Sequence, residues 1–194
     1  DQPRSRGLGD VYKRQAQGSD IAQAVFVEVD VAEKDFFSEA AYFCARADDA
    51  TSGIIGVVAA CRPEHADMTQ QLESLAHPRL VGFRRVLHTQ PDEQSQSALF
   101  RDNIARIGRA GLSFDLCVLP RQLAIGAQLV DSCPDTHFIL DHCGVPNIAA
   151  GDLSDWRKQI SDIARRPHLA CKISGIIASV SYTHLRAHET EADL

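Results

Sequence analysis

Residues 138–146, FILDHCGVP, are the stretch of this chain with the strongest chemical signal. An apolar run ends abruptly in Asp141 and His142, and a glycine and a proline then turn the chain. A buried parallel strand has this pattern when it delivers polar groups to the rim of an α/β sheet. A histidine there can ligate a metal, transfer a proton or donate to a substrate oxygen. The alternative is a loop histidine bonded to a neighbour.

Two cations interrupt other apolar runs. Arg84 follows LVGF at 80–83, and Lys172 stands inside LACKISG at 169–175. Burying such a charge without an anionic partner is costly. Each cation is therefore predicted either to bind a substrate carboxylate or carbonyl or to form a structural ion pair with an acid of the rim. A Schiff base at Lys172 has no support in the sequence.

Acidic residues break the apolar runs in the same way. Asp115 splits the run 112–118, and Glu28 interrupts 25–29. Asp115 is predicted to accept from Arg84 or Lys172 and orient it, whereas Glu28 fits a site role and a structural pair equally well. The residues expected to carry chemistry are His142, Arg84 and Lys172, and those expected to bind substrate are Asp115, Glu28 and Asp141.

Other candidates rank lower. Asp30, Arg62 and Arg85 also stand near strand ends, and alternation along each strand decides which side chains face inward. His88 follows the Arg84 strand and is interpreted as a loop residue in preference to a rim residue. The sequence holds no H-E-x-x-H, no Gly-x-Ser-x-Gly and no phosphate-binding or dinucleotide glycine fingerprint.

A repeating pattern must position these side chains. An apolar, often β-branched run precedes a polar turn and then a helical segment, and this unit recurs about every 25–30 residues. The predicted strands are Ala24–Val29, Ile54–Ala59, Leu80–Val86, Leu112–Val118, His137–Leu140 and Leu169–Ile173. The predicted helices are Glu33–Arg46, Glu64–Leu75, Ser97–Ala110, Pro120–Ser132 and Asp152–Arg165.

Such alternation predicts parallel strands joined by crossover helices. Six units fit either a doubly wound sheet or a (β/α)8 barrel from which two units are missing. Both ends depart from the pattern: residues 1–15 and 179–194 are polar, lack periodicity and resemble translated sequencing-adapter DNA. We expect them to be tails outside the folded region 16–178.

Composition sets further limits. The 194 residues are 44% hydrophobic and 24% charged with a net charge of −6, as in an ordinary soluble domain. The sequence has no basic stripe that would predict nucleic-acid binding. It also has no apolar run that reaches the ~20 residues of a membrane helix. A small molecule is the expected partner, and the oligomeric state is not predicted.

The six cysteines show no C-x-x-C spacing. Several lie in or beside apolar runs, where cysteine behaves as a small buried hydrophobe. Reduced thiols and a cytoplasmic location are therefore expected.

Four motifs in order resemble the amidohydrolase-2 family. They are Gly-x-Arg at 82–84, Phe-Asp-Leu at 114–116, Leu-Asp-His-x-Gly at 140–144 and Lys-x-Ser-Gly at 172–175. The resemblance covers nearly all of 16–178 and is strongest to the sugar-lactone hydrolase branch, with L-fuconolactonase-like and L-rhamnonolactonase-like proteins. Each motif alone is weak, and the set is specific.

The resemblance implies a truncated TIM-type barrel holding strands 2 to 7. It implies hydrolytic ring opening of a sugar lactone or related ester in carbohydrate metabolism, with His142, Arg84 and Lys172 stabilising the developing oxyanion. The family's strand 1 His-x-His and strand 8 Asp have no counterpart here, so the fragment itself is expected to be inactive. The cofactor expectation is no metal or one divalent ion, zinc being one candidate and His142 one ligand candidate.

Two rival functions stay open. One is a zinc-dependent amidohydrolase or decarboxylase on the same barrel. The other is a non-catalytic α/β module of flavodoxin-like type that binds a small ligand.

Overall fold

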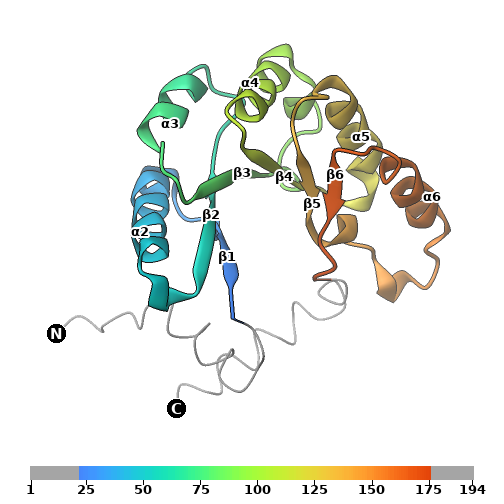
Figure 1. The fold of residues 1–194 in the computed structure, drawn as a ribbon. Helices are drawn as coiled ribbons and strands as arrows, with labels where there is room; N and C mark the ends of the chain where they lie inside the picture. The colour runs from blue at the N-terminus through green and yellow to red at the C-terminus, as the bar shows by residue number, and fades with distance from the viewer. Residues whose placement is uncertain (1–21, 176–194) are drawn as a thin grey trace.

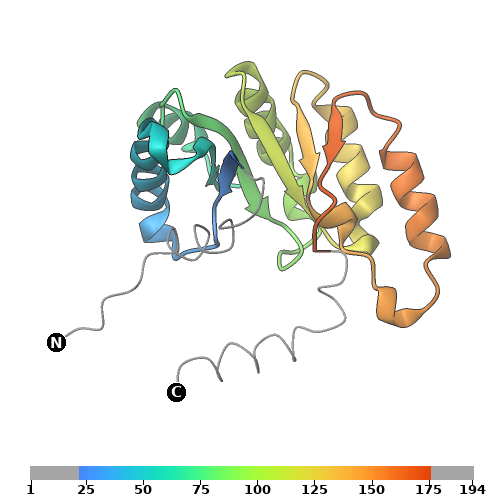
Figure 2. The same cartoon turned by 60° about the horizontal axis from the view of Figure 1, so that its bottom comes forward.

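The computed structural model describes residues 22–175. Six parallel strands form one sheet whose spatial order follows the sequence, β1-β2-β3-β4-β5-β6. The sheet is curved, and the helices line its outer side in an arc (Figures 1 and 2). The strands are β1 Ala24–Val27, β2 Ile54–Ala60, β3 Leu80–Val86, β4 Ser113–Cys117, β5 Phe138–Leu140 and β6 Leu169–Cys171.

Each strand is joined to the next by a helix on that outer side. The helices are α2 Phe36–Asp48, α3 Met68–Ser74, α4 Ala98–Arg109, α5 Leu123–Ser132 and α6 Ser154–Ile163. Local signals set several boundaries. The Ser97 hydroxyl accepts from the Phe100 amide at 3.2 Å and caps α4, a contact that contributes about 1 kcal/mol. Short 3-10 turns precede α2 and α5.

Of the two predicted architectures, the doubly wound sheet and the truncated (β/α)8 barrel, this arrangement confirms the truncated barrel. A doubly wound sheet reverses its strand order at a switch point, whereas the order here runs from β1 to β6 without reversal. The six predicted strands are all present, with ends that differ by at most two residues. The expected tails at 1–15 and 179–194 lie outside the described residues.

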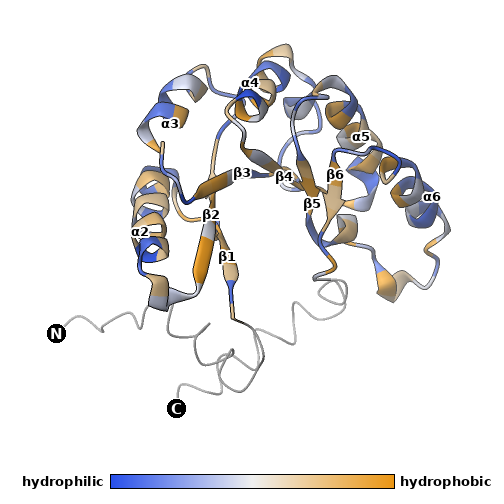
Figure 3. Cartoon of the chain, in the orientation of Figure 1, coloured by the Kyte–Doolittle hydropathy of each residue, from blue (hydrophilic) through white to orange (hydrophobic). Residues whose placement is uncertain are grey.

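The hydrophobic core lies between the outer sheet face and the helices. Alternate strand residues point to this side, among them Phe83 of β3, Phe114 of β4 and Phe138 of β5, and all three are fully buried. The Phe114 ring meets that of Phe100 at 6.3 Å and that of Phe138 at 6.0 Å, both edge to face. Hydropathy colouring shows this distribution, with apolar strands and helices that are polar on part of their surface (Figure 3).

The opposite, inner face carries the charged residues. Register pairs Arg84 with Asp115 and Asp115 with Ile139 on adjacent strands. Since side chains alternate along a strand, Arg84 and Asp115 leave the sheet on the side away from the phenylalanine core. The ladder continues past β6, where the Lys172 amide donates to the Leu140 carbonyl at 2.9 Å. The curved sheet thus brings these residues towards a common centre.

No helix in residues 22–175 combines the length and apolar character needed to cross a membrane.

Candidate functional site

Five charged side chains from five strands meet at the carboxyl ends of the sheet. We call Glu28, Arg84, Asp115, Asp141 and Lys172 the charge cluster. Asp141 stands at its centre, with Oδ2 3.3 Å from Arg84 Nη1 and Oδ1 2.8 Å from Lys172 Nζ. The second contact is a close ion pair without hydrogen-bond alignment, because Asp141 Oδ1 has no hydrogen-bond partner. One buried carboxylate therefore joins both predicted cations.

Arg84 is held by two chain segments at once. Its Nε donates to Glu28 Oε1 and its Nη2 to the Glu28 carbonyl, both at 2.5 Å. The second Glu28 oxygen accepts from the Asp30 amide at 2.6 Å. Burial alone would lower the pKa of Arg84, and the contacts with Glu28 and Asp141 outweigh it and raise that pKa. Arg84 thus forms a permanently charged link between the ends of β1, β3 and β5.

Lys172 lies against two carboxylates. Its ammonium forms an ion pair with Asp115 in addition to the contact with Asp141. Asp115 is fully buried, and its Oδ1 has no hydrogen-bond partner in the described structure. Burial therefore raises the pKa of Asp115, and Lys172 only partly opposes it. Burial would lower the pKa of Lys172, but its bonds to Asp115 and Asp141 raise it.

Directly after Asp141 the backbone turns left-handed for four residues, which we call the left-handed turn. The φ angles are 53° at His142, 53° at Cys143, 68° at Gly144 and 50° at Val145. Only glycine adopts this region freely, and other residues lose roughly 1–2 kcal/mol each. Strained backbone of this kind collects at functional sites, where the surrounding structure enforces it.

Several contacts enforce the left-handed turn. The Trp156 indole N–H of α6 donates to the Cys143 carbonyl at 2.9 Å, and Cys143 Sγ donates to the Lys172 carbonyl at 3.4 Å. Gly144 lies so close to Leu123 of α5 that a Cβ there would be 2.7 Å from Leu123 Cδ2. Helices α5 and α6 and the end of β6 thus fix the turn together.

The turn places the His142 ring against the end of the described chain. Its Nδ1 lies 2.9 Å from Ser174 Oγ, and a Cβ at Gly175 would be 2.7 Å from that same nitrogen. Ser174 was not among the predicted site residues, although it belongs to the Lys-x-Ser-Gly motif. This contact orients the His142 ring, and the Ser174 hydroxyl can either donate to Nδ1 or accept from an Nδ1–H.

The lower-ranked candidates divide between the two faces. The structure contradicts a rim position for Arg85. Its side chain points into the helix layer and pairs with Glu64 at 2.6 Å. Arg62 lies 3.4 Å from Glu33 and stacks over the Phe36 ring, so it joins the β2 end to α2. Alternation explains the Arg85 result, since it follows the inward-facing Arg84 directly.

His88 lies in a turn after β3, in agreement with the loop interpretation, and its ring contacts a residue of the inner face. It continues the inner-face series of β3 beyond its end, and its Nδ1 lies 3.4 Å from Cys117 Sγ of β4. Asp30, Arg84 and His142 all act electrostatically on its ring. Its position two residues past an inward-facing strand residue was the available signal.

The described residues do not fit a metal ion. Within residues 22–175 no three His, Cys, Asp or Glu side chains are grouped to hold one. The carboxylates that might serve already contact Arg84 and Lys172, and His142 Nδ1 contacts Ser174.

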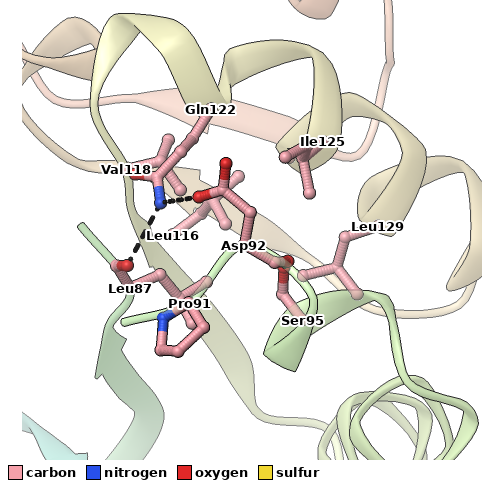
Figure 4. Close-up of a pocket in the computed structure, with 10 residues that line it drawn as sticks. Leu87, Pro91, Asp92, Ser95, Leu116, Val118, Gln122, Ile125 and Leu129 are labelled. Atoms are coloured by element: carbon pink, nitrogen blue, oxygen red, sulfur yellow. Dashed lines mark hydrogen bonds between the residues drawn. The ribbon is translucent and has the colours of Figure 1, made fainter. Parts of the chain in front are cut away.

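The thiols and the small cavity lie mainly outside the cluster. All six cysteines are free, four of them buried, and the predicted cytoplasmic location stays a prediction. A cavity of about 10 Å³ lies between β4 and α5, where Gln122 donates to Asp92 and to the Leu87 carbonyl (Figure 4). That volume holds about one water molecule.

The fold and the cluster define a barrel-type α/β protein with its polar groups at the carboxyl ends of the strands. Residues 9–193 match the Amidohydrolase family, and the chain belongs to this family. The predicted family resemblance is confirmed.

Curated relatives point to the lactonase branch. The chain is 31% identical over 120 residues to an L-fucono-1,5-lactonase of Burkholderia multivorans, covering 57% of this chain and 40% of that protein. It is 28% identical over 128 residues to an L-fucono-1,5-lactonase of Burkholderia ambifaria, covering 65% of this chain and 44% of that protein. The chain thus spans less than half the length of these relatives.

Solved structures share the fold. A Burkholderia multivorans amidohydrolase superposes with a TM-score of 0.79 at 22% identity, covering 96% of this chain and 71% of that one, in a form with bound HEPES and a form with bound zinc. A probable 2-pyrone-4,6-dicarboxylic acid hydrolase of Acinetobacter baumannii has a TM-score of 0.70 at 10% identity, covering 95% and 66%.

Proposed function

We propose that this chain forms the substrate-facing wall of a hydrolase that opens a sugar lactone by water attack on the ring carbonyl. The observation that carries the proposal is the position of Asp141. It contacts Arg84 and Lys172 at once and is followed directly by His142 in the left-handed turn. The L-fucono-1,5-lactonase relatives support the substrate class.

The described residues differ in how they would meet the substrate. An ammonium has three N–H donors; among the described residues Asp115 accepts one of those of Lys172, and Asp141 forms an ion pair with the same ammonium. Its side chain is also 31% exposed, against 15% for Arg84. Lys172 is therefore the cation that donates to the substrate carbonyl oxygen, while Arg84 orders Glu28 and Asp141.

The reaction balances as ordinary ester hydrolysis. The water oxygen forms a bond to the carbonyl carbon, and the negative charge that develops on the carbonyl oxygen is stabilised by Lys172 and by an N–H of His142. Collapse of this intermediate breaks the bond to the ring oxygen, which becomes a hydroxyl by taking up a proton equivalent to the one that the attacking water has lost. The product is a hydroxy acid, and its release of a proton can be followed. No described residue is assigned as the base.

Because this chain is itself expected to be inactive, the test measures acid release by a full-length parent enzyme that contains residues 22–175, with a panel of five- and six-membered sugar lactones that includes L-fucono-1,5-lactone. We expect ring opening above the spontaneous rate, and Lys172→Met to lower kcat by about 10²–10³, as loss of one oxyanion donor does. His137→Gln, at the opposite end of β5, is the control and should keep the parent rate. Parent protein that opens no lactone in the panel contradicts the substrate class, and Lys172→Met at the full rate contradicts the role.

A further inference from the structure

A second imidazole faces the same end of the sheet as His142. Every second residue of β3 and of the segment after it, at positions 82, 84, 86 and 88, lies on the same face. Arg84 in this series belongs to the charge cluster. The ladder continues past the strand, because the Leu87 amide donates to the Cys117 carbonyl at 3.0 Å. His88 therefore lies on the inner face, four residues beyond Arg84 and two beyond Val86, towards the carboxyl end of the sheet.

Cys117 fixes the orientation of this ring. Register pairs it with Val86, and its Sγ lies 3.4 Å from His88 Nδ1. Burial, aided by the charge of Asp141, raises the pKa of Cys117 to about 12. The group is thus a thiol at neutral pH, with an S–H to donate and a sulfur that is a poor acceptor. Nδ1 of His88 is then the acceptor, and the ring proton lies on Nε2.

The ring is also uncharged near neutral pH. Burial lowers the pKa of His88, Asp30 opposes this, and Arg84 and His142 lower it further. The contact with Cys117, which alternates to the inner face with Asp115, places the ring at the rim and not in the helix layer. A half-buried neutral imidazole with its N–H directed away from Cys117 is a hydrogen-bond donor without a charge.

The other histidines of residues 22–175 are engaged elsewhere. His168 Nε2 lies 3.2 Å from the Val130 carbonyl, and His77 contacts Asp48 and the Arg79 amide. His65 faces Glu33, and His137 is exposed at the amino end of β5. His88 and His142 are thus the two imidazoles that the described chain brings to the rim.

We propose that His88 is a substrate-binding residue whose Nε2–H donates to an oxygen of the bound sugar lactone, with the Cys117 thiol fixing the tautomer. The proposal rests on the proposed lactone hydrolysis for the identity of the ligand. A polyhydroxylated ring offers several acceptor oxygens, and a neutral donor binds them without attracting the carboxylate product. His88 then selects substrate while Lys172 and His142 stabilise the charge that develops at the carbonyl.

The tautomer is tested first, without any ligand. Imidazole nitrogens of the ¹⁵N-labelled protein are observed by NMR at pH 7.5, and we expect Nδ1 of His88 to be unprotonated and Nε2 protonated. Cys117→Ala should mix the two tautomers, and Cys117→Ser should favour the Nε2–H form less strongly than the thiol does, because a hydroxyl both donates and accepts. A His88 ring protonated on Nδ1 in the parent protein overturns the inference.

Ligand contact is tested second, with L-fuconate, the ring-opened acid of L-fucono-1,5-lactone, and with the lactone itself. The lactone should shift His88 Nε2 more than fuconate does and leave His137 unchanged. In the assay, His88→Phe should raise KM about tenfold with a smaller change in kcat, and His88→Gln, which keeps an N–H donor, should recover most of the loss.

The outcomes separate the two proposals. If the lactone is hydrolysed and shifts His142 but not His88, or if His88→Phe leaves KM unchanged, the role of His88 is wrong and the proposed function stands. If the parent neither binds nor opens any lactone, the proposed function and the substrate role of His88 fail together, even with the predicted tautomer present.

Discussion

The ammonium of Lys172 lies against Asp115 although the two residues are 57 positions apart in the chain. The contact spans from β4 to the end of β6, across the intervening strand β5, which contributes Asp141 to the same ammonium. The inner face is therefore organised by charge pairs between strands that are not neighbours, in addition to the backbone ladder between those that are.

The raised pKa of Asp115 predicts a pH dependence of stability. Folding favours the protonated carboxyl, so between its unfolded pKa near 4 and its raised folded pKa the native state binds more protons than the unfolded state. Stability from this group is fully present below the unfolded pKa and is lost as pH rises through the folded pKa. Asp115→Asn should remove this loss.

Urea unfolding of both proteins across pH 4–8 measures the effect. The difference in free energy of unfolding, parent minus Asp115→Asn, should fall as pH rises. A difference that is constant or increases over this range would contradict a raised pKa for Asp115 in the folded protein. Asp131→Asn is the control. Arg166 lowers the pKa of this exposed acid, so the difference in free energy of unfolding, parent minus Asp131→Asn, should not fall as pH rises.

Removing the guanidinium of Arg84 should be strongly destabilising. Arg84→Met leaves the Glu28 carboxylate buried without its cation and removes one of the two cations at Asp141, a change that costs about 3–5 kcal/mol. The control is Arg166→Met, because Arg166 pairs with the exposed Asp131 and such pairs contribute about 1 kcal/mol or less. Equal shifts of the urea midpoint for both variants would contradict the buried linkage.

The contact between Gly144 and Leu123 predicts a position-specific cost for alanine. Gly144→Ala and Gly111→Ala both place a Cβ on backbone with φ near 70°, which costs about 1–2 kcal/mol. A Cβ at Gly111 meets no atom within 4 Å, whereas at Gly144 it overlaps the Leu123 side chain. Gly144→Ala should therefore lower the melting temperature clearly more than Gly111→Ala, as calorimetry can measure. Equal losses would place the turn away from α5.

Ser174→Ala should weaken the orientation of His142 and leave the fold intact. A hydrogen bond of this kind contributes about 1 kcal/mol, so the lactonase rate should fall about fivefold. Ser174→Thr keeps the hydroxyl and should recover the rate. The NMR chemical shifts of the His142 ring nitrogens test the contact independently of activity. Unchanged shifts in Ser174→Ala would contradict the contact.

The strands were predictable because each is a short apolar run between turn signals. β3, Leu80–Val86, has the predicted bounds, and the shorter β1 and β6 end where a charge interrupts the run, at Glu28 and Lys172. Asp115 was predicted as an acceptor for Arg84 or Lys172, and the structure pairs it with Lys172. The catalytic and substrate-binding roles of these residues stay predictions.

The left-handed turn was not predictable from local preference. His142, Cys143 and Val145 all avoid positive φ as single residues, and the conformation exists because Trp156, Leu123 and the end of β6 surround it. The contacts of His142 with Ser174 and of His88 with Cys117 join residues 32 and 29 positions apart. Such contacts depend on strand register, which a single sequence does not specify.

The sequential strand order has a consequence for local opening. In the described sheet β3 and β4 are bonded on both sides, whereas β1 and β6 are each bonded on one. Amide hydrogen exchange should therefore be slowest at the centre and become faster outward in both directions. The Arg84 and Asp115 backbones stay ordered longest, and the segments that carry Glu28 and Lys172 are the first to fray.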